Sequence, residues 1–197
     1  SDALTLTAGA NTQLSNYTVT VRNGTLTINK ANATVTANSG TLTYNGLTQT
    51  VSGFSVSGLV NNETSSVLTG LSESGGSGIN ADSYSHRYAV GSYSGNYTLS
   101  FNDGSLTINK AHLTVTADNQ SRLYGQANPT FAQTVTGFVN SEDARVLSGT
   151  AGNASSTAIA TTGIGAYTIT GSVGTLSADN YDFTKADGTL TINKAHL

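Results

Sequence analysis

Few side chains in this sequence could do chemistry, and their spacing argues against catalysis. The histidines, His86, His112 and His196, stand in none of the paired His or Cys spacings that bind zinc, and the chain has no cysteine. The glycine- and serine-rich stretch at 74–78 lacks the lysine and helix start of a phosphate-binding loop. No Gly-Xaa-Ser-Xaa-Gly motif is followed by a matched acid and histidine. We therefore expect no enzyme activity, no metal and no cofactor.

One divergent stretch, the loop 75–93, offers side chains that could bind a ligand. It contains four aromatic or basic residues close together and a further tyrosine: Tyr84, His86, Arg87, Tyr88 and Tyr93. Aromatic rings can bind sugars by stacking on them. In a chain without tryptophan, however, tyrosines are also natural core residues, and a histidine here can be a packed or exposed side chain.

The positions of these residues are set by a tandem repeat. Nearly the same octapeptide, Gly-Thr/Ser-Leu-Thr-Ile-Asn-Lys-Ala, occurs at 24–31, 104–111 and 188–195. A recurrence of this kind must be settled before single residues are read, because each copy is one structural unit. The period of about 80 residues divides the chain into the last third of one repeat and two complete repeats: 1–30, 31–110 and 111–197.

We interpret the Asn-Lys-Ala at the end of the octapeptide as the joint between repeats. Apolar residues alternate on even positions before it, at Leu106 and Ile108, and on odd positions after it, at Leu113 and Val115. A strand can change phase in this way only at a bulge or where it leaves one core for another. Without proline or glycine, the joint should be short and stiff. Its residues are Asn29, Lys30 and Ala31 in the first case and Asn109, Lys110 and Ala111 in the second.

Comparison of the repeats argues against two special sites. A calcium site at Asp179, Asp182 and Asp187 should recur, but the first complete repeat offers only Asp103 there, so capping and turn bonding explain these acids better. A Lys–Asn cross-link would need Lys110 in an apolar pocket that depresses its pKa, whereas a lysine just after a strand is expected to be exposed. Several Asn-Xaa-Ser/Thr sequons permit glycosylation without showing it.

Alternation of polar and apolar residues, as in Thr-Leu-Thr-Ile, predicts strands. In the second complete repeat we expect them at 113–117, 131–138, 156–161, 167–170, 180–184 and 189–193. An Asn-Gly or Asp-Gly pair precedes the last strand of all three copies, ending at Gly24, Gly104 and Gly188. Such pairs favour a tight hairpin between the last two strands.

The matching segments 58–70 and 137–149 break the β pattern. In the second of them, residues 140–147 begin with a capping residue, continue with two acids and end with apolar residues. This order predicts a short helix. Strands around one short helix predict a mainly β, β-grasp-like module with parallel first and last strands. The chain would enter and leave such a module at opposite ends, and tandem modules would form an elongated array. An immunoglobulin-like β-sandwich is the alternative.

Composition excludes other classes of protein. The net charge of −3 is too mild for nucleic-acid binding, and charged residues make up only 10% of the chain. No run of eighteen apolar residues is present, so we expect no membrane insertion. Without cysteine, each repeat must be stabilised by its core and hydrogen bonds alone.

Both complete repeats resemble a known family. The Tyr-Gly, Asn-Pro, Gly-Phe-Val-Asn and Asn-Tyr-Asp motifs of 111–195 are similar to MBG/YDG-type repeats of large bacterial surface proteins, including filamentous-haemagglutinin-like adhesins. Residues 31–110 match less well between Gly75 and Tyr93, and residues 1–30 match the end of a third copy. The resemblance implies a secreted or cell-surface stalk segment of an adhesin or biofilm-matrix protein, and it implies no catalytic residues.

Two functional hypotheses follow. In the first, the repeats are spacers that project a distal adhesive region from the cell, and their partners are neighbouring repeats of the same chain. In the second, they bind carbohydrate, a biofilm-matrix polysaccharide or a host surface through the loop 75–93. Residues 1–30 have material for about three strands but no complete core, so they should pack on the first repeat or pair with another chain.

Overall fold

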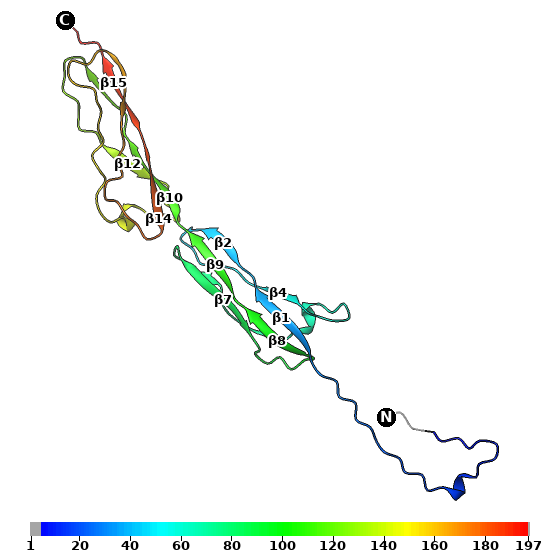
Figure 1. Cartoon of the computed structure of the whole chain (residues 1–197). Coiled ribbons are helices and arrows are strands. Elements are labelled where there is room, and N and C mark those ends of the chain that lie inside the picture. The colour runs from blue at the N-terminus through cyan, green and yellow to red at the C-terminus, as the bar shows by residue number, and fades with distance from the viewer. Residues whose placement is uncertain (1–4, 197) are drawn as a thin grey trace. The chain divides into compact units, whose positions relative to one another are not determined.

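The structure is a computed structural model that describes residues 5–196 and falls into two units, 1–30 and 31–197 (Figure 1). Within the first unit, residues 5–30 are exposed and contain one 3₁₀ turn, η1 (Leu14–Asn16), and no strand. The three strands expected here are therefore not formed. Leu26 and Ile28 are each 86% exposed, whereas their equivalents Leu106 and Ile108 are 0% and 2% exposed. The octapeptide thus folds as a strand only where the rest of its repeat is present to pair with it.

The first complete repeat is built from two main sheets and a short strand pair. In one sheet, β1 (Ala31–Ala37) lies between an antiparallel strand, β4 (Phe54–Ser57), and a parallel strand, β8 (Tyr97–Asn102). The other has the order β2-β9-β7-β5, with the bounds Gly40–Thr43, Gly104–Asn109, Ser83–Ala89 and Ser72–Gly75. The strand pair is β3 (Gln49–Thr50) with β6 (Ser77–Gly78).

The second complete repeat has two sheets of the same plan, but within its described residues the second sheet has three strands, without a counterpart of β5. β10 (Ala111–Ala117) lies between antiparallel β12 (Gln133–Thr136) and parallel β14 (Tyr181–Ala186). β15 (Gly188–Asn193) lies between parallel β11 (Gln120–Leu123) and antiparallel β13 (Gly165–Ile169). Of the strands predicted for this repeat, the one at 156–161 is not formed, and β11 was not expected.

The mainly β fold predicted from the sequence is confirmed. The predicted parallel pairing of the first and last strands is wrong, because β1 and β10 pair in parallel with the second-last strands, β8 and β14. The last strands, β9 and β15, pair in parallel with β2 and β11 instead. The predicted short helix is reduced to one 3₁₀ turn per repeat, η2 (Ser65–Val67) and η3 (Ala144–Val146). The Asp143 carboxylate accepts a hydrogen bond from the Arg145 backbone N–H at 2.9 Å, so it caps η3 as a short polar residue should.

The predicted hairpin at the end of each repeat is wrong. β8 and β9 are separated only by Asp103, but they belong to different sheets and do not pair with each other. The same holds for β14 and β15 around Asp187. A Cβ atom on Gly104 would lie 2.3 Å from the Asn38 carbonyl oxygen, and one on Gly188 would lie 2.2 Å from that of Ala117. These glycines are therefore required for close backbone approach where the strand changes sheets, and not for a turn.

Candidate functional site: the joint between the repeats

A single residue, Lys110, separates the last strand of one repeat from the first strand of the next. Figure 1 shows β9 leading directly into β10. The Asn109 carbonyl accepts a hydrogen bond from the Tyr44 N–H at 2.8 Å, and the Ala111 N–H donates to the Asn180 carbonyl at 3.0 Å. The exposed Lys110 ammonium donates to the Ala178 carbonyl at 2.9 Å, so this lysine does not lie in an apolar pocket.

One hydrophobic core runs across this joint. Its buried members come from both repeats: Tyr44, Leu106 and Ile108 from the first, and Ala111, Leu113 and Tyr181 from the second. Partly buried apolar residues of both repeats surround them, among them Val51 and Tyr84 on one side and Val135, Phe138 and Val139 on the other. Because shared burial must be lost before the repeats can separate, this core resists bending at the joint.

At the centre of the joint, one carboxylate accepts hydrogen bonds from tyrosines of two different repeats. Glu142, which lies just before η3, accepts from the Tyr44 hydroxyl at 2.6 Å through Oε1 and from the Tyr181 hydroxyl through Oε2. The two tyrosine rings meet edge to face with their centroids 5.5 Å apart. We call Tyr44, Glu142 and Tyr181 the joint triad.

Burial keeps both phenols of the joint triad protonated. Burial, together with the hydrogen bond to Glu142, raises the pKa of Tyr44 to about 12. The pKa of Tyr181 is also raised, first by burial and then by Glu142. Since only the protonated phenol can donate to a carboxylate, these shifts favour the donor form of both tyrosines.

Two asparagines add polar contacts around the triad. The Asn140 side-chain amide donates to the Gly46 carbonyl at 3.0 Å, and Asn140 itself has a positive φ of 50°. Asn180 accepts from the Ala81 N–H at 2.8 Å and donates to the Asn80 side chain at 3.1 Å. Each of these hydrogen bonds joins one repeat to the other. Together they oppose rotation of one repeat relative to the next.

The residues proposed from sequence as joints are placed differently at their two occurrences. Asn109, Lys110 and Ala111 lie between the two repeats, with Ala111 5% exposed. Asn29 and Lys30 are exposed and outside any strand, and Ala31 begins β1. Sequence reasoning missed the joint triad as a contact. The available signal was the recurrence of all three residue types, as Tyr44 with Tyr124, Glu63 with Glu142, and Tyr97 with Tyr181.

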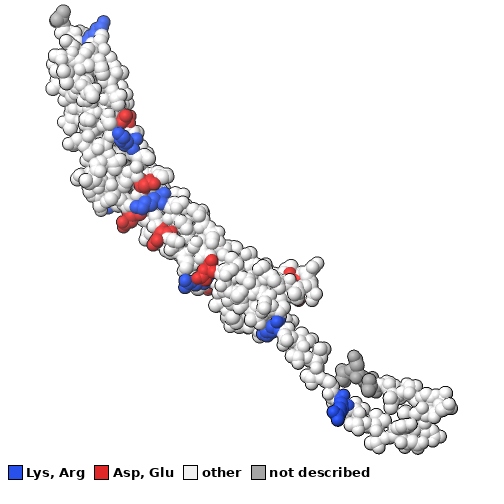
Figure 2. All heavy atoms as spheres, viewed as in Figure 1, with Lys and Arg blue, Asp and Glu red and all other residues white. Residues whose placement is uncertain are grey.

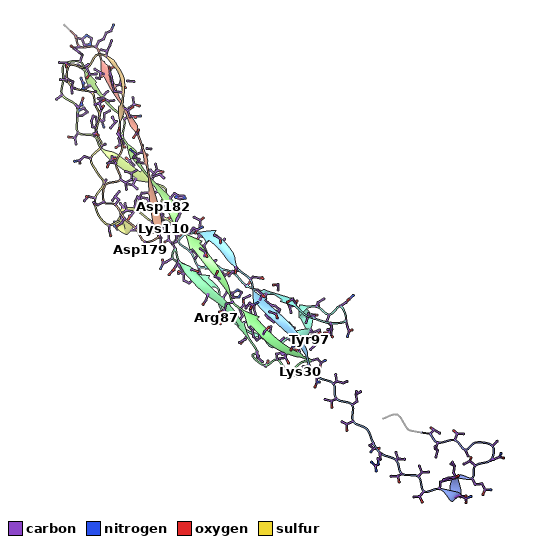
Figure 3. All side chains as sticks on the ribbon, viewed as in Figure 1. Lys30, Arg87, Tyr97, Lys110, Asp179 and Asp182 are labelled. Atoms are coloured by element: carbon purple, nitrogen blue, oxygen red, sulfur yellow. The ribbon has the colours of Figure 1, made fainter. Side chains whose placement is uncertain are left out.

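The five residues proposed from sequence as a ligand surface do not all lie on one face of the repeat. On β7, Tyr84, His86 and Tyr88 alternate with exposed Arg87, so they point to the opposite face. Figure 3 labels Arg87 on this strand. Tyr84 packs against the core at the joint, and Tyr88 and Tyr93 pack against the core of the first repeat. His86 is 0% exposed, so a ligand cannot reach it.

Buried His86 instead pairs with Glu73, a carboxylate that is 40% exposed. One ring nitrogen lies 2.8 Å from the Asn38 carbonyl oxygen, and the other lies 2.8 Å from Oε1 of Glu73. Both partners are acceptors, which suits an imidazolium with two N–H donors. The Asn38 carbonyl and then Glu73 raise the pKa of His86 against the opposing effect of burial, and His86 lowers the pKa of Glu73. His86 lies opposite Gly104 in the first repeat. In the second repeat, Ile169 lies opposite Gly188 and therefore occupies the equivalent position.

Two of the acids near the C-terminus, Asp182 and Asp187, have ordinary polar partners. Asp182 pairs with His112 across β10 and β14, and the Asp187 carboxylate accepts from the Gly171 N–H at 2.9 Å. Figure 3 labels Asp182 and Asp179 near Lys110. Among residues 5–196, no three His, Asp or Glu side chains gather closely enough to hold a metal ion. In the same part of the chain, no helix is long and apolar enough to cross a membrane.

Comparison with known families identifies the repeat. The sequence pattern of the MBG domain, YGX type, matches residues 33–107 and 113–191, one match in each complete repeat. The chain belongs to the MBG domain family. The resemblance seen in the sequence is thereby confirmed. A search of curated proteins finds no match to the chain. The joint triad lies between two consecutive MBG repeats, with Tyr44 in the first and Glu142 and Tyr181 in the second.

Proposed function

We propose that these MBG repeats form a spacer in a secreted or cell-surface bacterial protein and hold a distal adhesive region away from the cell. The observation that carries the proposal is the shared core with the joint triad. A spacer must keep its length, and a joint that buries apolar side chains from both repeats opposes folding back.

The surface supports the same role. Charged residues are few, and most of the face shown in Figure 2 is neither acidic nor basic. In the described repeats, the tyrosines considered for sugar binding pack into cores. The side-chain contacts between the two repeats therefore favour a segment whose partners are neighbouring repeats.

Strand pairing also suits a segment that is pulled from its two ends. In each repeat, the first strand pairs in parallel with a late strand, as in β1 with β8 and β10 with β14. A pull on the two ends of a repeat then acts along these strands in opposite directions. The hydrogen bonds of a parallel ladder are evenly spaced, so they share the load and must break together.

Single-molecule force spectroscopy tests the proposal. The chain is pulled from its termini, and each complete repeat is expected to unfold in one discrete step. The step should equal the extended length of the repeat, about 27 nm at roughly 3.4 Å per residue, minus the end-to-end length of the folded repeat. Smooth extension at low force, without discrete steps, would show that the repeats cannot bear load and would contradict the spacer function.

A further inference from the structure

The two outer ends of the repeat pair carry the same groups that meet at the joint. In the first repeat, Glu63 corresponds to Glu142 and Tyr97 to Tyr181. The Tyr97 hydroxyl donates to Glu63, and the Val60 N–H donates to that hydroxyl at 3.1 Å. In the second repeat, the Val139 N–H makes the same 3.1 Å bond to the Tyr181 hydroxyl. The carboxylate half of the triad is thus already assembled at the outer end of the first repeat.

The opposite end of the pair carries the tyrosine half. Tyr124 corresponds to Tyr44, and the backbone places them alike, because the Tyr124 N–H donates to the Asn193 carbonyl at 2.9 Å as the Tyr44 N–H does to Asn109 at 2.8 Å. Tyr44 is 5% exposed, whereas Tyr124 is 46% exposed. The loop that carries Tyr124 is held by buried Arg122, which donates to the Asn128 side chain at 2.7 Å and to the Ile159 carbonyl.

Apolar residues next to these groups are exposed at both outer ends of the repeat pair. Val139 packs into the core at the joint, but its counterpart Val60 is 47% exposed. Beside Tyr124 at the other end, Leu123, Ile159 and Ile164 are 37%, 65% and 52% exposed. Within residues 5–196, the Oε1 atom of Glu63 accepts no hydrogen bond, while the same atom of Glu142 accepts from Tyr44.

We propose that the Glu63 face of the first repeat and the Tyr124 end of the second are two halves of one joint, and that the partner of each is another repeat of this kind. When the two meet, the Tyr124 hydroxyl donates to Glu63, and a triad of Tyr124, Glu63 and Tyr97 forms. At the joint, the Ala81 N–H donates to the Asn180 side chain. In the new joint, the Ile164 N–H donates in the same way to Asn96, the counterpart of Asn180. The inference stands on the matched ends and does not depend on the spacer role.

The test joins two copies of the chain in line. Residues 1–194 are followed directly by a second copy of residues 31–197, so that Asn193 and Lys194 precede Ala31 and restore the Asn-Lys-Ala joint. The second copy carries Tyr124→Phe, so the reactive Tyr124 belongs to the first copy alone. Nitration of Tyr124 is followed by mass spectrometry in the fused and single chains, with the 65% exposed Tyr17 as reference and the buried Tyr44 as a check of folding.

In the fused chain, Tyr124 should react about fivefold more slowly than in the single chain, the factor that corresponds to one net hydrogen bond. Glu63→Gln in the second copy should restore part of the reactivity, because it removes the charged acceptor. Equal reactivity of Tyr124 in the fused and single chains, with Tyr44 still protected, would overturn the proposal. A fused chain protected equally with and without Glu63→Gln would also overturn it, because the carboxylate would then take no part.

Discussion

Glu142 is the residue at which the two repeats depend on each other most directly. Its carboxylate is partly buried and accepts from Tyr44 of one repeat and Tyr181 of the other. A hydrogen bond to a charged group contributes more to stability than one between neutral groups, and a partner left buried and unpaired adds a further cost. The joint triad should therefore account for a measurable share of the coupling between the repeats.

Tyr44→Phe is expected to lower the free energy of unfolding by about 1.5–3 kcal/mol. The substitution removes the hydroxyl donor, so Oε1 of Glu142 loses its hydrogen bond from Tyr44. Urea unfolding followed by circular dichroism measures the change, and a double-mutant cycle with Glu142→Gln isolates the coupling between the two side chains. Tyr124→Phe is the matched control. It removes the same hydroxyl from an exposed tyrosine and should change stability by less than about 0.5 kcal/mol. Equal effects of the two substitutions would exclude a special role for the Tyr44 hydroxyl.

The buried His86 predicts a pH dependence of the first repeat. The pKa of His86 is raised in the folded state, so its stabilising contribution is complete below its ordinary pKa of about 6.5 and is lost as pH rises through the folded value. The pKa of Glu73 is lowered, so its contribution is complete above its ordinary pKa of about 4.3 and is lost as pH falls through the folded value. The pair therefore stabilises the repeat most at mildly acidic pH, between these two losses.

Unfolding by urea across pH 5 to 9 measures this dependence. The control is the double variant His86→Ile with Glu73→Ala. It replaces the histidine with the residue type that the second repeat has at the equivalent position, Ile169, and it removes the carboxylate. Because an isoleucine fills the same position in the second repeat, this variant should fold, and it should lose the decline toward alkaline pH. A wild-type stability that does not fall above pH 6.5 would show that His86 is not held as an imidazolium.

At the scale of elements, the glycine that begins the octapeptide has a role that depends on its surroundings. Gly104 and Gly188 lie where the last strand passes from one sheet to the other, against backbone carbonyls at 2.3 Å and 2.2 Å from the site of a Cβ atom. Gly24 occupies the same place in the first octapeptide, where no other atom lies within 4 Å of that site. One motif thus supplies both a test position and its control.

Gly104→Ala should destabilise the first repeat by roughly 1–3 kcal/mol, because its methyl group would overlap the Asn38 carbonyl and force the backbone apart. Gly24→Ala should leave the unfolding midpoint nearly unchanged. Thermal unfolding of both variants, followed by far-ultraviolet circular dichroism, measures the difference. If Gly104→Ala is as stable as Gly24→Ala, β8 and β9 do not cross between sheets as closely as described.

Sequence patterns predict the elements better than the way they connect. Alternation in Thr-Leu-Thr-Ile correctly places β9 and β15, because period-two burial is local. The same local signal at Asp103-Gly104 suggests a hairpin, since it cannot show that Asp103 leads into a different sheet. Likewise His86 stands in a polar, serine-rich stretch, and only the pairing of β7 with β5 and β9 reveals that it is buried.

At the scale of the whole molecule, the joint determines whether two MBG repeats behave as one body. Several hydrogen bonds across it join residues 94 to 100 positions apart in the sequence, such as Asn140 with Gly46 and Asn180 with Asn80. Such pairs cannot be identified from local spacing, although the recurrence of the tyrosines and glutamates hints at them. The repeat itself was therefore predictable, whereas the contacts that hold one repeat on the next were not.

The most direct test of a fixed joint is a distance distribution measured across it by pulsed electron paramagnetic resonance. Because the chain has no cysteine, Ser57→Cys and Thr136→Cys place spin labels only at equivalent exposed positions on β4 and β12. A second pair within one repeat, Ser57→Cys with Ser85→Cys, gives the width expected for a rigid body. We predict that the distribution across the joint is single and no broader than this reference. A broad or multiple distribution across the joint would contradict a rigid connection between the repeats and, with it, the spacer function.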